Sequence, residues 1–387
     1  MNILVISSDG LYKNLNMSFV HNQARELAAM GHRVRVLLLT GFGKCDLAGR
    51  RMGPVLQVSK EDGVEICRLR YITLSRFGEK LGFNVKSARA AISLWGGPVF
   101  RDFQPDVIHA HNLGFSSQTG AWLKKRLRCP LVVTTHGSDV SIPFERGERE
   151  MLKRWSDQAD YVGCGSSALA ARLEACGTNT PLTVILNGFQ TSYLPRSDEK
   201  KPLTFVQVGH LLAQKRFYIT IRAFAEIHRR HPEAELTLIG QGPDRERLER
   251  LCRDLGVEDS VTFTGQIHNQ EVLRYMGQSQ FFVMPSVREG FGIVYLEAMA
   301  AGCITIGTQG EGIADLIVDG KNGFLVPADT PEAIVEVVER CLARPELMSA
   351  VTAAGRKDAG ELTWRRSAER YTALFEKLTR KETGEKR

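Results

Sequence analysis

The chain has 387 residues, 43% of them hydrophobic, which is too much for one ordinary core and fits two α/β domains of under about 200 residues each. Its net charge of +7 belongs to the first half, since residues 1–197 hold 25 Lys plus Arg against 16 Asp plus Glu (+9), which leaves 26 against 28 (−2) for the rest. No run of about 18 apolar residues and no nucleic-acid recognition motif occurs, so we exclude a membrane-spanning helix and expect no nucleic-acid partner, whereas the basic half still fits an anionic membrane surface.

The first half alternates short β-rich runs with helical stretches, a pattern typical of an open parallel sheet. A strand is predicted at 3–7, an amphipathic helix at 18–30 that Gly31 ends, and a second strand at 34–39. The polar loop 8–17 follows the first strand at its carboxyl end. Ligands of such folds bind at that end of the sheet.

Residues 74–103 carry few strand signals and mix basic with large apolar side chains. The basic members are Arg76, Lys80, Lys86, Arg89 and Arg101, and the apolar ones are Phe77, Leu81, Phe83, Leu94, Trp95 and Phe100. An amphipathic basic segment of this kind can lie on a membrane surface. The alternative, which the composition favours slightly, is a helix packed on its own sheet with solvated lysines.

Two strands of the first half carry histidines to their carboxyl ends. Residues 105–111 (P-D-V-I-H-A-H) predict a strand with two imidazoles, and 131–139 (L-V-V-T-T-H-G-S-D) predict a strand that ends at His136. Gly137 permits a tight turn there, and Asp139 suits the start of a helix or loop. A single histidine is more often structural than catalytic, so this pattern alone leaves both interpretations open.

The polar, proline-containing residues 191–202 predict an interdomain linker. We therefore place the first domain at 1–192 and the second at 200–363. The second domain opens with a strand that runs into Gly209 and His210, after which Lys215 and Arg216 start a helix that reaches His231. A strand with a glycine turn is predicted at 235–242, further strands at 261–265 and 304–307, and helices at 331–342, 345–354 and 364–379.

The most informative stretch is a strand, a glycine turn and a helix, at 281–284, 289–292 and 293–301. Its glycines let the backbone approach a ligand, and the helix start offers unpaired N–H groups that suit a phosphate. Glu289 and Glu297 flank this turn, and carboxylates accept hydrogen bonds from sugar hydroxyls. The pattern indicates a nucleotide-sugar site, and an ordinary βα turn with two solvated glutamates is an equal alternative.

The sequence from Glu289 to Glu297, E-G-F-G-I-V-Y-L-E, resembles the E-x7-E motif of the GT4-type retaining glycosyltransferases, a family of the polysaccharide and cell-envelope pathways. H-G-S-D at 136–139 resembles that family's H-G-[ST]-D motif. The resemblance covers nearly the whole chain and is weakest at 40–105. It implies the GT-B fold, with two Rossmann-like α/β domains facing across a central cleft and helix 364–379 packing back on the first domain.

The resemblance also implies roles for individual residues. Glu289 would lie beside the donor sugar, and Glu297 would accept hydrogen bonds from the ribose hydroxyls. The amides of Gly292, Ile293 and Val294 would hold the diphosphate and sugar. His136 would reach the donor sugar and the acceptor as a catalytic residue, with Asp139 as its weaker companion.

This chain departs from the family pattern at two places. Relatives carry a Gly-Gly pair in the loop that corresponds to 8–17, and this loop lacks it. Relatives also show Gly-Arg-Leu at the turn of the second domain, with a lysine five residues after the arginine. Here the turn reads Gly209-His210, so Lys215, together with Arg216, remains as the phosphate cation of the donor site.

These features predict a hexosyltransferase that moves a sugar from a UDP- or GDP-sugar to a saccharide or lipid-linked acceptor and retains the anomeric configuration. We expect same-face attack by the acceptor hydroxyl, because no carboxylate pair is evident in the first domain. We expect no metal and no cofactor. The alternatives are a catalytically silent nucleotide-sugar-binding scaffold and a sugar-nucleotide epimerase of the same fold.

The eight cysteines contain no C-x-x-C pair, which is typical of a protein in a reducing cytosol. The first residues predict a short buried strand and not a signal peptide. We expect a cytoplasmic protein, and the basic first half also fits peripheral attachment at the inner face of the plasma membrane.

Overall fold

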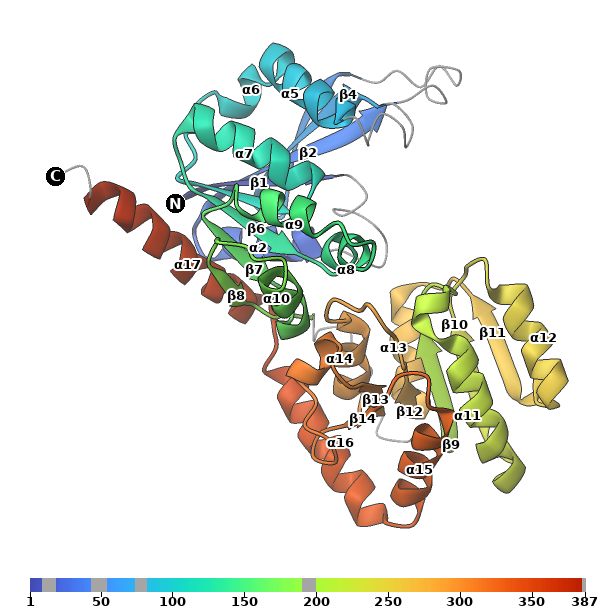
Figure 1. Cartoon of the computed structure of the whole chain (residues 1–387). Coiled ribbons are helices and arrows are strands. Elements are labelled where there is room, and N and C mark those ends of the chain that lie inside the picture. The colour runs from blue at the N-terminus through green and yellow to red at the C-terminus, as the bar shows by residue number, and fades with distance from the viewer. Residues whose placement is uncertain (9–18, 43–53, 74–81, 190–199, 385–387) are drawn as a thin grey trace. The chain divides into compact units, whose positions relative to one another are not determined.

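The computed structural model describes residues 1–8, 19–42, 54–73, 82–189 and 200–384, of which 381–384 only as backbone. They form two compact units, the N-unit (Met1–Leu186 with Trp364–Arg387) and the C-unit (Asn187–Thr363) (Figure 1). Loop 8–17 lies almost wholly outside the described residues, as does most of the predicted linker. No helix in the described part of the chain is both long and apolar enough to cross a bilayer.

The N-unit is built on an eight-stranded sheet in the order β3-β4-β2-β1-β5-β6-β7-β8. Neighbouring strands pair in parallel, except that β3 and β4 form an antiparallel hairpin. The strands are β1 (Asn2–Ser8), β2 (Arg33–Phe42), β3 (Leu56–Glu61), β4 (Val64–Ile72), β5 (Val107–His111), β6 (Leu131–Thr135), β7 (Tyr161–Cys164) and β8 (Leu182–Val184).

Alternate residues of the N-unit strands enter two separate cores, because successive side chains of a strand point to opposite faces. Leu4 and Ile6 belong to a core on the face of α5 (Phe83–Trp95), α6 (Gly97–Phe100), α7 (Phe115–Leu127), α8 (Ser138–Glu145), α9 (Arg149–Ser156) and α10 (Ser167–Glu174). Ile3 and Val5 belong to the other core, which α2 (Phe19–Ala29) and α17 (Trp364–Gly384) cover. Helix α17 thus lies against α2 and closes one face of the N-unit (Figure 1).

The C-unit has six strands, all parallel, in the order β11-β10-β9-β12-β13-β14. They are β9 (Lys201–Val208), β10 (Glu235–Ile239), β11 (Val261–Gly265), β12 (Ser279–Val283), β13 (Ile304–Thr308) and β14 (Phe324–Val326). One face packs on α11 (Phe217–Arg230), α12 (Arg245–Leu255) and α15 (Pro331–Leu342). On the other lie α13 (Asn269–Gln278) and α14 (Ile293–Ala300), and α16 (Pro345–Gly360) packs on α14.

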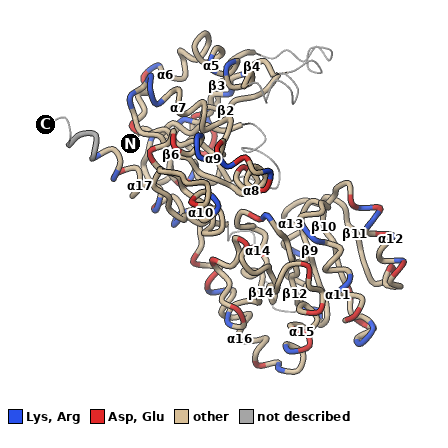
Figure 2. Tube along the Cα trace, in the orientation of Figure 1, with Lys and Arg blue, Asp and Glu red and all other residues tan. Residues whose placement is uncertain are grey.

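Charge is mixed within the C-unit, whose residues 187–363 hold 19 Lys plus Arg against 24 Asp plus Glu (−5). Along α12 the acidic and basic residues alternate, and Figure 2 shows both colours interspersed there. A helix with both signs on its exposed side is well solvated and presents no single-sign field. The strong positive charge of the chain therefore belongs to the N-unit.

The described elements match the predicted ones with shifts of one or two residues at most ends. Strand β11 and helix α15 have the predicted bounds, whereas α16 runs on to Gly360 and α17 to Gly384. The hairpin β3–β4 is absent from the predicted elements. Its turn residues Asp62 and Gly63 have φ of 48° and 81°, and Asp-Gly is a typical hairpin turn.

Candidate functional site

The centre of the C-unit sheet is a point where the chain changes direction. From β9 it proceeds through β10 to β11 at one edge, and it then returns to the other side of β9 to build β12, β13 and β14. The loops at the carboxyl ends of β9 and β12 therefore lead to opposite faces, which opens a crevice where ligands of α/β sheets bind. These two loops carry Lys215 and Glu289.

Lys215 and Glu289 form an ion pair in which Lys215 Nζ donates to Glu289 Oε2. Their side chains are 18% and 17% exposed, so the pair remains reachable from solvent. Ser286 Oγ donates to the same carboxylate oxygen at 3.0 Å. Burial alone would raise the pKa of Glu289, but Lys215 and Ser286 outweigh it and lower that pKa. Glu289 is thus held as an anion beside one cation.

The backbone brings the two loops together independently of this ion pair. Val287 N donates to Gln214 O at 2.9 Å, which joins the loop after β12 to the short 3₁₀ turn Ala213–Lys215. Arg288, next to Glu289, has φ of 64°, a conformation that costs a non-glycine residue about 1 kcal/mol or more. Local strain of this kind is found where the surrounding structure holds a functional loop.

Two glycines shape the backbone around Glu289, and one of them, Gly312, lets a third loop approach it. A Cβ atom on Gly312 would lie 1.9 Å from Gly290 O, so this position requires glycine. The close approach places Glu311 so that its Oε2 accepts a hydrogen bond from Glu289 N at 3.0 Å. Gly292, with φ of 76°, has no room for a Cβ either, because it would meet the Tyr295 ring at 2.7 Å.

Helix α14 begins directly after Gly292. Its first backbone hydrogen bond is donated by Tyr295 N to Gly292 O, at 3.0 Å, so the amides of Ile293 and Val294 precede the helical ladder. Such amides lie at the positive end of the helix dipole and are suited to a phosphate. The predicted amide group therefore sits at the start of a helix next to Glu289.

Glu297 lies on α14 and is partly exposed. Burial raises the pKa of Glu297 to about 7, and a hydrogen bond with Asn269 opposes this rise only in part. The carboxyl therefore changes its charge near neutral pH. It can accept two hydroxyl hydrogen bonds fully only when it is ionised.

The remaining residues predicted for this site have different positions. Gly209 packs under the aliphatic stem of Lys215, since a Cβ there would lie 3.6 Å from the lysine's Cδ. His210 is exposed, and its Nδ1 lies 3.3 Å from Gln241 O. The Arg216 guanidinium is bound to Asp329, with Nε 2.9 Å from Oδ1. Arg216 thus braces the loop before α15, and Lys215 is the cation beside Glu289.

The N-unit has its own direction change at β1, which lies between β2 and β5. Strands β5 and β6 continue away from it, with His109 opposite Val132 and His111 opposite Thr134. Residues two apart in a strand share a face, so His109 and His111 both point to the face of α2 and α17. The next turn, after β6, carries His136.

These three histidines are in direct contact. The rings of His109 and His111 have centroids 4.3 Å apart, and His111 Nδ1 lies 3.1 Å from His136 Nε2. His136 also lies nearly parallel to Phe19 of α2, at 5.5 Å between centroids. Burial lowers the pKa of all three imidazoles, that of His109 to about 3. The cluster is therefore neutral at physiological pH.

Asp139, predicted as the companion of His136, uses both carboxylate oxygens on backbone amides. Oδ1 accepts from His136 N at 3.0 Å and from Gly137 N at 2.8 Å, while Oδ2 accepts from Leu113 N at 2.9 Å. The side chain joins the loops that follow β5 and β6. The structure thus gives Asp139 the geometry of a clamp that places His136.

Four residues of these sites are missing from the sequence-based prediction. Ser286 and Glu311 hold Glu289, Asn269 contacts Glu297, and Tyr371 of α17 accepts a hydrogen bond from Thr134 beside His109. Three of these contacts join residues more than 20 positions apart. No short motif signals such contacts, because they depend on which strands become neighbours.

Comparisons with known proteins find similarity over both units of the chain. The family models described as "Glycosyltransferase Family 4" and "Glycosyl transferases group 1" match residues 18–193 and 193–358. A GDP-mannose-dependent alpha-(1-6)-phosphatidylinositol monomannoside mannosyltransferase of Mycolicibacterium smegmatis is 31% identical over 265 residues, which are 63% of this chain and 69% of that protein.

Two solved structures share the fold. Sucrose-phosphate synthase of Thermosynechococcus elongatus has a TM-score of 0.77 at 22% identity and covers 97% of this chain and 98% of its own. Anabaena HepE in complex with UDP-glucose has a TM-score of 0.72 at 18% identity and covers 97% and 99%. The likeness extends over both α/β units.

Proposed function

Because the chain belongs to the family 4, group 1 glycosyltransferases, and is thus a hexosyltransferase of the GT-B class, we propose that its donor is a nucleoside-diphosphate sugar. The observation that carries this proposal is the Lys215–Glu289 pair at the direction change of the C-unit sheet, next to the first amides of α14. The mycobacterial relative is named for GDP-mannose, and HepE was solved with UDP-glucose. Both are compatible with such a site.

In the proposed mechanism the C-unit neutralises the leaving nucleoside diphosphate. Lys215 Nζ supplies the cation, and the amides of Ile293 and Val294 supply donors at the positive end of α14. Preorganised groups of this kind stabilise charge that develops in the transition state. Glu297 accepts hydrogen bonds from the ribose hydroxyls, and Glu289 lies beside the sugar, where positive charge develops.

We further propose that the anomeric configuration is retained through same-face attack by the acceptor hydroxyl. A double displacement would need a carboxylate free to attack the sugar. Asp139, the carboxylate of the H-G-S-D motif, has both oxygens engaged by three backbone amides. Proton NMR of the first product formed from an α-linked donor tests the retention, and a β-linked product would overturn it. A covalent sugar–protein adduct trapped from the donor and seen by mass spectrometry would instead contradict the same-face attack.

The acceptor that we propose is a saccharide or lipid-linked sugar of the cell envelope, reached at an anionic membrane surface. The first half of the chain carries +9, the end of α5 exposes Leu94 (70%) and Trp95 (48%), and Arg101 at the end of α6 is exposed too. Lys86 of the same helix is exposed as well. Apolar and basic side chains that share a surface fit the boundary of an anionic bilayer.

One cation predicted for this surface is directed elsewhere. Arg89 Nη2 donates to Gln118 O at 2.8 Å, and burial lowers the pKa of its guanidinium. The structure therefore assigns Arg89 to the contact between α5 and α7. Lys80 lies outside the described residues, which leaves Lys86 and Arg101 as the cations to test.

Calorimetry with UDP and GDP, in chelator and without added metal, tests the donor site. We expect one of the two to bind without a divalent ion, because Lys215 and the α14 amides meet the phosphate charge. Lys215→Ala should weaken this binding at least tenfold, whereas Arg216→Ala, its sequence neighbour bound to Asp329, should change it little. Binding that vanishes in chelator and returns with magnesium or manganese would contradict the proposed site.

A further inference from the structure

His111 is buried to 2% exposure, and its Nδ1 lies 3.1 Å from His136 Nε2. The two rings are nearly parallel, at 14°, with centroids 5.3 Å apart. They come from different loops at the carboxyl ends of β5 and β6. A contact between two ring nitrogens at this distance is a hydrogen bond, so one nitrogen carries a proton and the other does not.

The environment of His111 restricts both its ring and its charge. His109 packs on it at 4.3 Å, and His109 Nε2 lies 2.7 Å from Thr134 Oγ1, which donates to the Tyr371 hydroxyl at 2.7 Å. This row connects α17 to the ring of His136. Burial and the two neighbouring imidazoles lower the pKa of His111. Its ring therefore stays neutral and has little freedom to rotate.

A neutral imidazole has one N–H, so fixing one nitrogen of a ring fixes the other. At His136, Nε2 is engaged by His111, and Nδ1 has no hydrogen-bond partner among the described residues. The state of Nε2 decides whether Nδ1 is a donor or an acceptor. For a histidine that meets a substrate, this choice of tautomer is set by the hydrogen bond on the other nitrogen.

We propose that His111 is a positioning residue that holds the ring of His136 in one orientation and one tautomer, so that the buried and unpartnered Nδ1 of His136 keeps a single hydrogen-bonding character. That His136 takes part in sugar transfer is what the resemblance of H-G-S-D to the family motif implies, and it rests on the proposed function. The positioning by His111 rests only on the geometry of the two rings. The two statements can therefore fail separately.

The test uses the full chain with ¹⁵N-labelled histidine and follows the imidazole nitrogens by NMR, with the His136 signals assigned by their loss in His136→Gln. We expect wild-type His136 to show one protonated and one bare nitrogen. His111→Phe keeps a ring but removes the bond, and the two His136 nitrogens should then average between tautomers. His111→Asn, whose amide lies near the Nδ1 position, should restore the single tautomer.

His109→Phe is the matched control, because it alters the same buried row but leaves the nitrogens of His111 and His136 in contact. It should preserve the tautomer of His136. Release of nucleoside diphosphate from the donor, measured in parallel, should fall by about 10²-fold in His111→Phe and recover in His111→Asn. Donor affinity should stay the same in these two variants.

An averaged His136 in the wild type would overturn the proposal, and this measurement needs no variant to fold. So would an unchanged tautomer in His111→Phe, even with a loss of turnover, since such a loss would be merely structural. A wild type that binds neither UDP nor GDP would instead refute the proposed function and leave the tautomer result standing.

Discussion

At the residue scale, the two glutamates of the E-x7-E motif have opposite electrostatic environments. Lys215 keeps Glu289 ionised, whereas burial raises the pKa of Glu297 to about 7. Two like groups with pKa values driven apart often have separate tasks. One is poised as a permanent anion, and the other changes its charge near neutral pH.

We predict that Glu297→Ala weakens nucleotide binding, whereas Glu289→Ala mainly lowers turnover, by about 10²–10³-fold, because transition-state charge loses its partner. Wild-type affinity should rise with pH from 6 to 8 as Glu297 ionises, and Glu297→Gln should abolish that rise. Calorimetry across this pH range and steady-state kinetics provide the measurements. Equal losses of affinity in both alanine variants, with turnover intact, would refute the division of tasks.

The histidine cluster makes the stability of the N-unit depend on pH. Burial lowers the pKa of His109 to about 3 and that of His111 below its usual 6.5. The unfolded chain therefore binds more protons than the folded one below pH 6.5. The contribution of these imidazoles to stability is fully present above pH 6.5. It decreases as the pH falls toward the folded pKa values, by up to about 1.4 kcal/mol per pH unit for each imidazole.

Urea unfolding between pH 7.5 and 5 should show this decrease. In His109→Phe the free energy of unfolding should fall less steeply with decreasing pH, by the contribution of one proton. Other ionisable groups that face the cluster are Asp139 from α8 and Tyr371 from α17; the Asp139 carboxylate raises the pKa of His136 and moderates the effect. A free energy of unfolding that stays constant from pH 7.5 to 5 would show that protonation of these imidazoles does not destabilise the folded N-unit.

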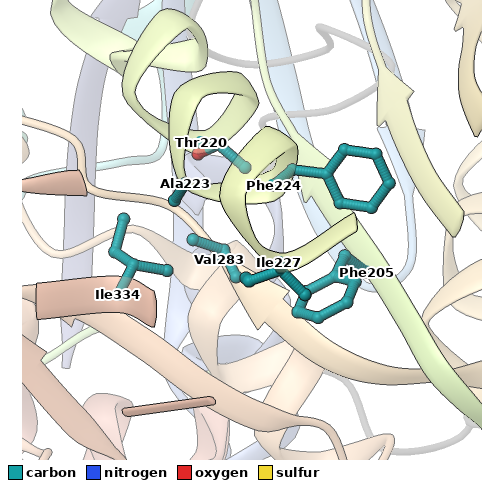
Figure 3. Close-up of a pocket in the computed structure, with 7 residues that line it drawn as sticks. All are labelled: Phe205, Thr220, Ala223, Phe224, Ile227, Val283 and Ile334. Atoms are coloured by element: carbon teal, nitrogen blue, oxygen red, sulfur yellow. The ribbon is translucent and has the colours of Figure 1, made fainter. Parts of the chain in front are cut away.

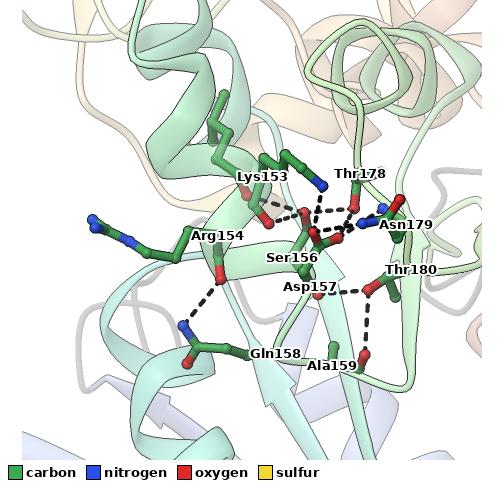
Figure 4. Close-up of polar contacts among 10 residues, drawn as sticks. Lys153, Arg154, Ser156, Asp157, Gln158, Ala159, Thr178, Asn179 and Thr180 are labelled. Atoms are coloured by element: carbon green, nitrogen blue, oxygen red, sulfur yellow. Dashed lines mark hydrogen bonds and ion pairs between the residues drawn. The ribbon is translucent and has the colours of Figure 1, made fainter.

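At the element scale, α9 and the segment before β8 are held together by one carboxylate. Asp157 accepts hydrogen bonds from Lys153 Nζ at 2.6 Å, Asn179 N at 2.7 Å and Thr178 Oγ1 at 2.8 Å (Figure 4). Burial alone would raise the pKa of Asp157, but these hydrogen bonds outweigh it and lower that pKa to about 2.

Asp157→Ala should lower the free energy of unfolding by about 1–3 kcal/mol at pH 7, because a backbone N–H and a hydroxyl lose their acceptor together. Since the folded pKa is depressed, this contribution is present above pH 4 and disappears as the pH falls toward 2. Gln158→Ala removes one exposed hydrogen bond of the adjacent residue and serves as the control. Equal effects of the two substitutions would contradict the proposed role of Asp157 in joining α9 to the segment before β8.

Helix α11 contains a buried hydroxyl beside a small cavity of about 10 Å³ (Figure 3). Thr220 Oγ1 has no hydrogen-bond partner in the described part of the chain. Thr220→Val replaces this hydroxyl with a methyl group of similar shape and should raise the free energy of unfolding by up to about 1 kcal/mol. Thr119→Val is the matched control, because Thr119 Oγ1 donates to Phe115 O and its loss should destabilise.

Sequence patterns predict the regular elements well and their contacts poorly. The strands that β-branched and apolar runs indicate, such as β6 and β12, are present, and so is the helix after Gly292. The hairpin β3–β4 was missed because its strand β3, Leu56–Glu61, is short, has only Leu56 and Val58 as apolar residues and leaves Val58 57% exposed. Asp139 and Ser286 lie three residues from His136 and Glu289, but His111 and Glu311 are more than 20 residues away, and only the order of the strands in the sheet brings them close.

At the scale of the whole molecule, the positive charge of the first half and the exposed end of α5 predict binding to anionic vesicles. Lys86→Glu with Arg101→Glu should reduce sedimentation with such vesicles, since each basic residue near an anionic surface contributes about 1 kcal/mol. Binding should also decrease with salt. Arg250→Glu with Arg253→Glu makes the same charge change on α12 of the C-unit and should have little effect.

A wild type that ignores anionic vesicles even at low salt would refute the membrane proposal. The acceptor would then be sought among soluble saccharides. The donor-site predictions do not depend on this result, because they concern the C-unit alone.

The path of the chain through its two units has a consequence for biosynthesis. The C-unit is inserted between residue 186 and residue 364 of the N-unit, and α17 supplies Tyr371 and Phe375, which pack on His109. A ribosome releases these residues only after the C-unit, so the N-unit stays open along one face while the C-unit is being made. A nascent chain that lacks α17 has the strand histidines but not the helix that buries them, and the cluster matures only in a chain whose C-unit has already been made.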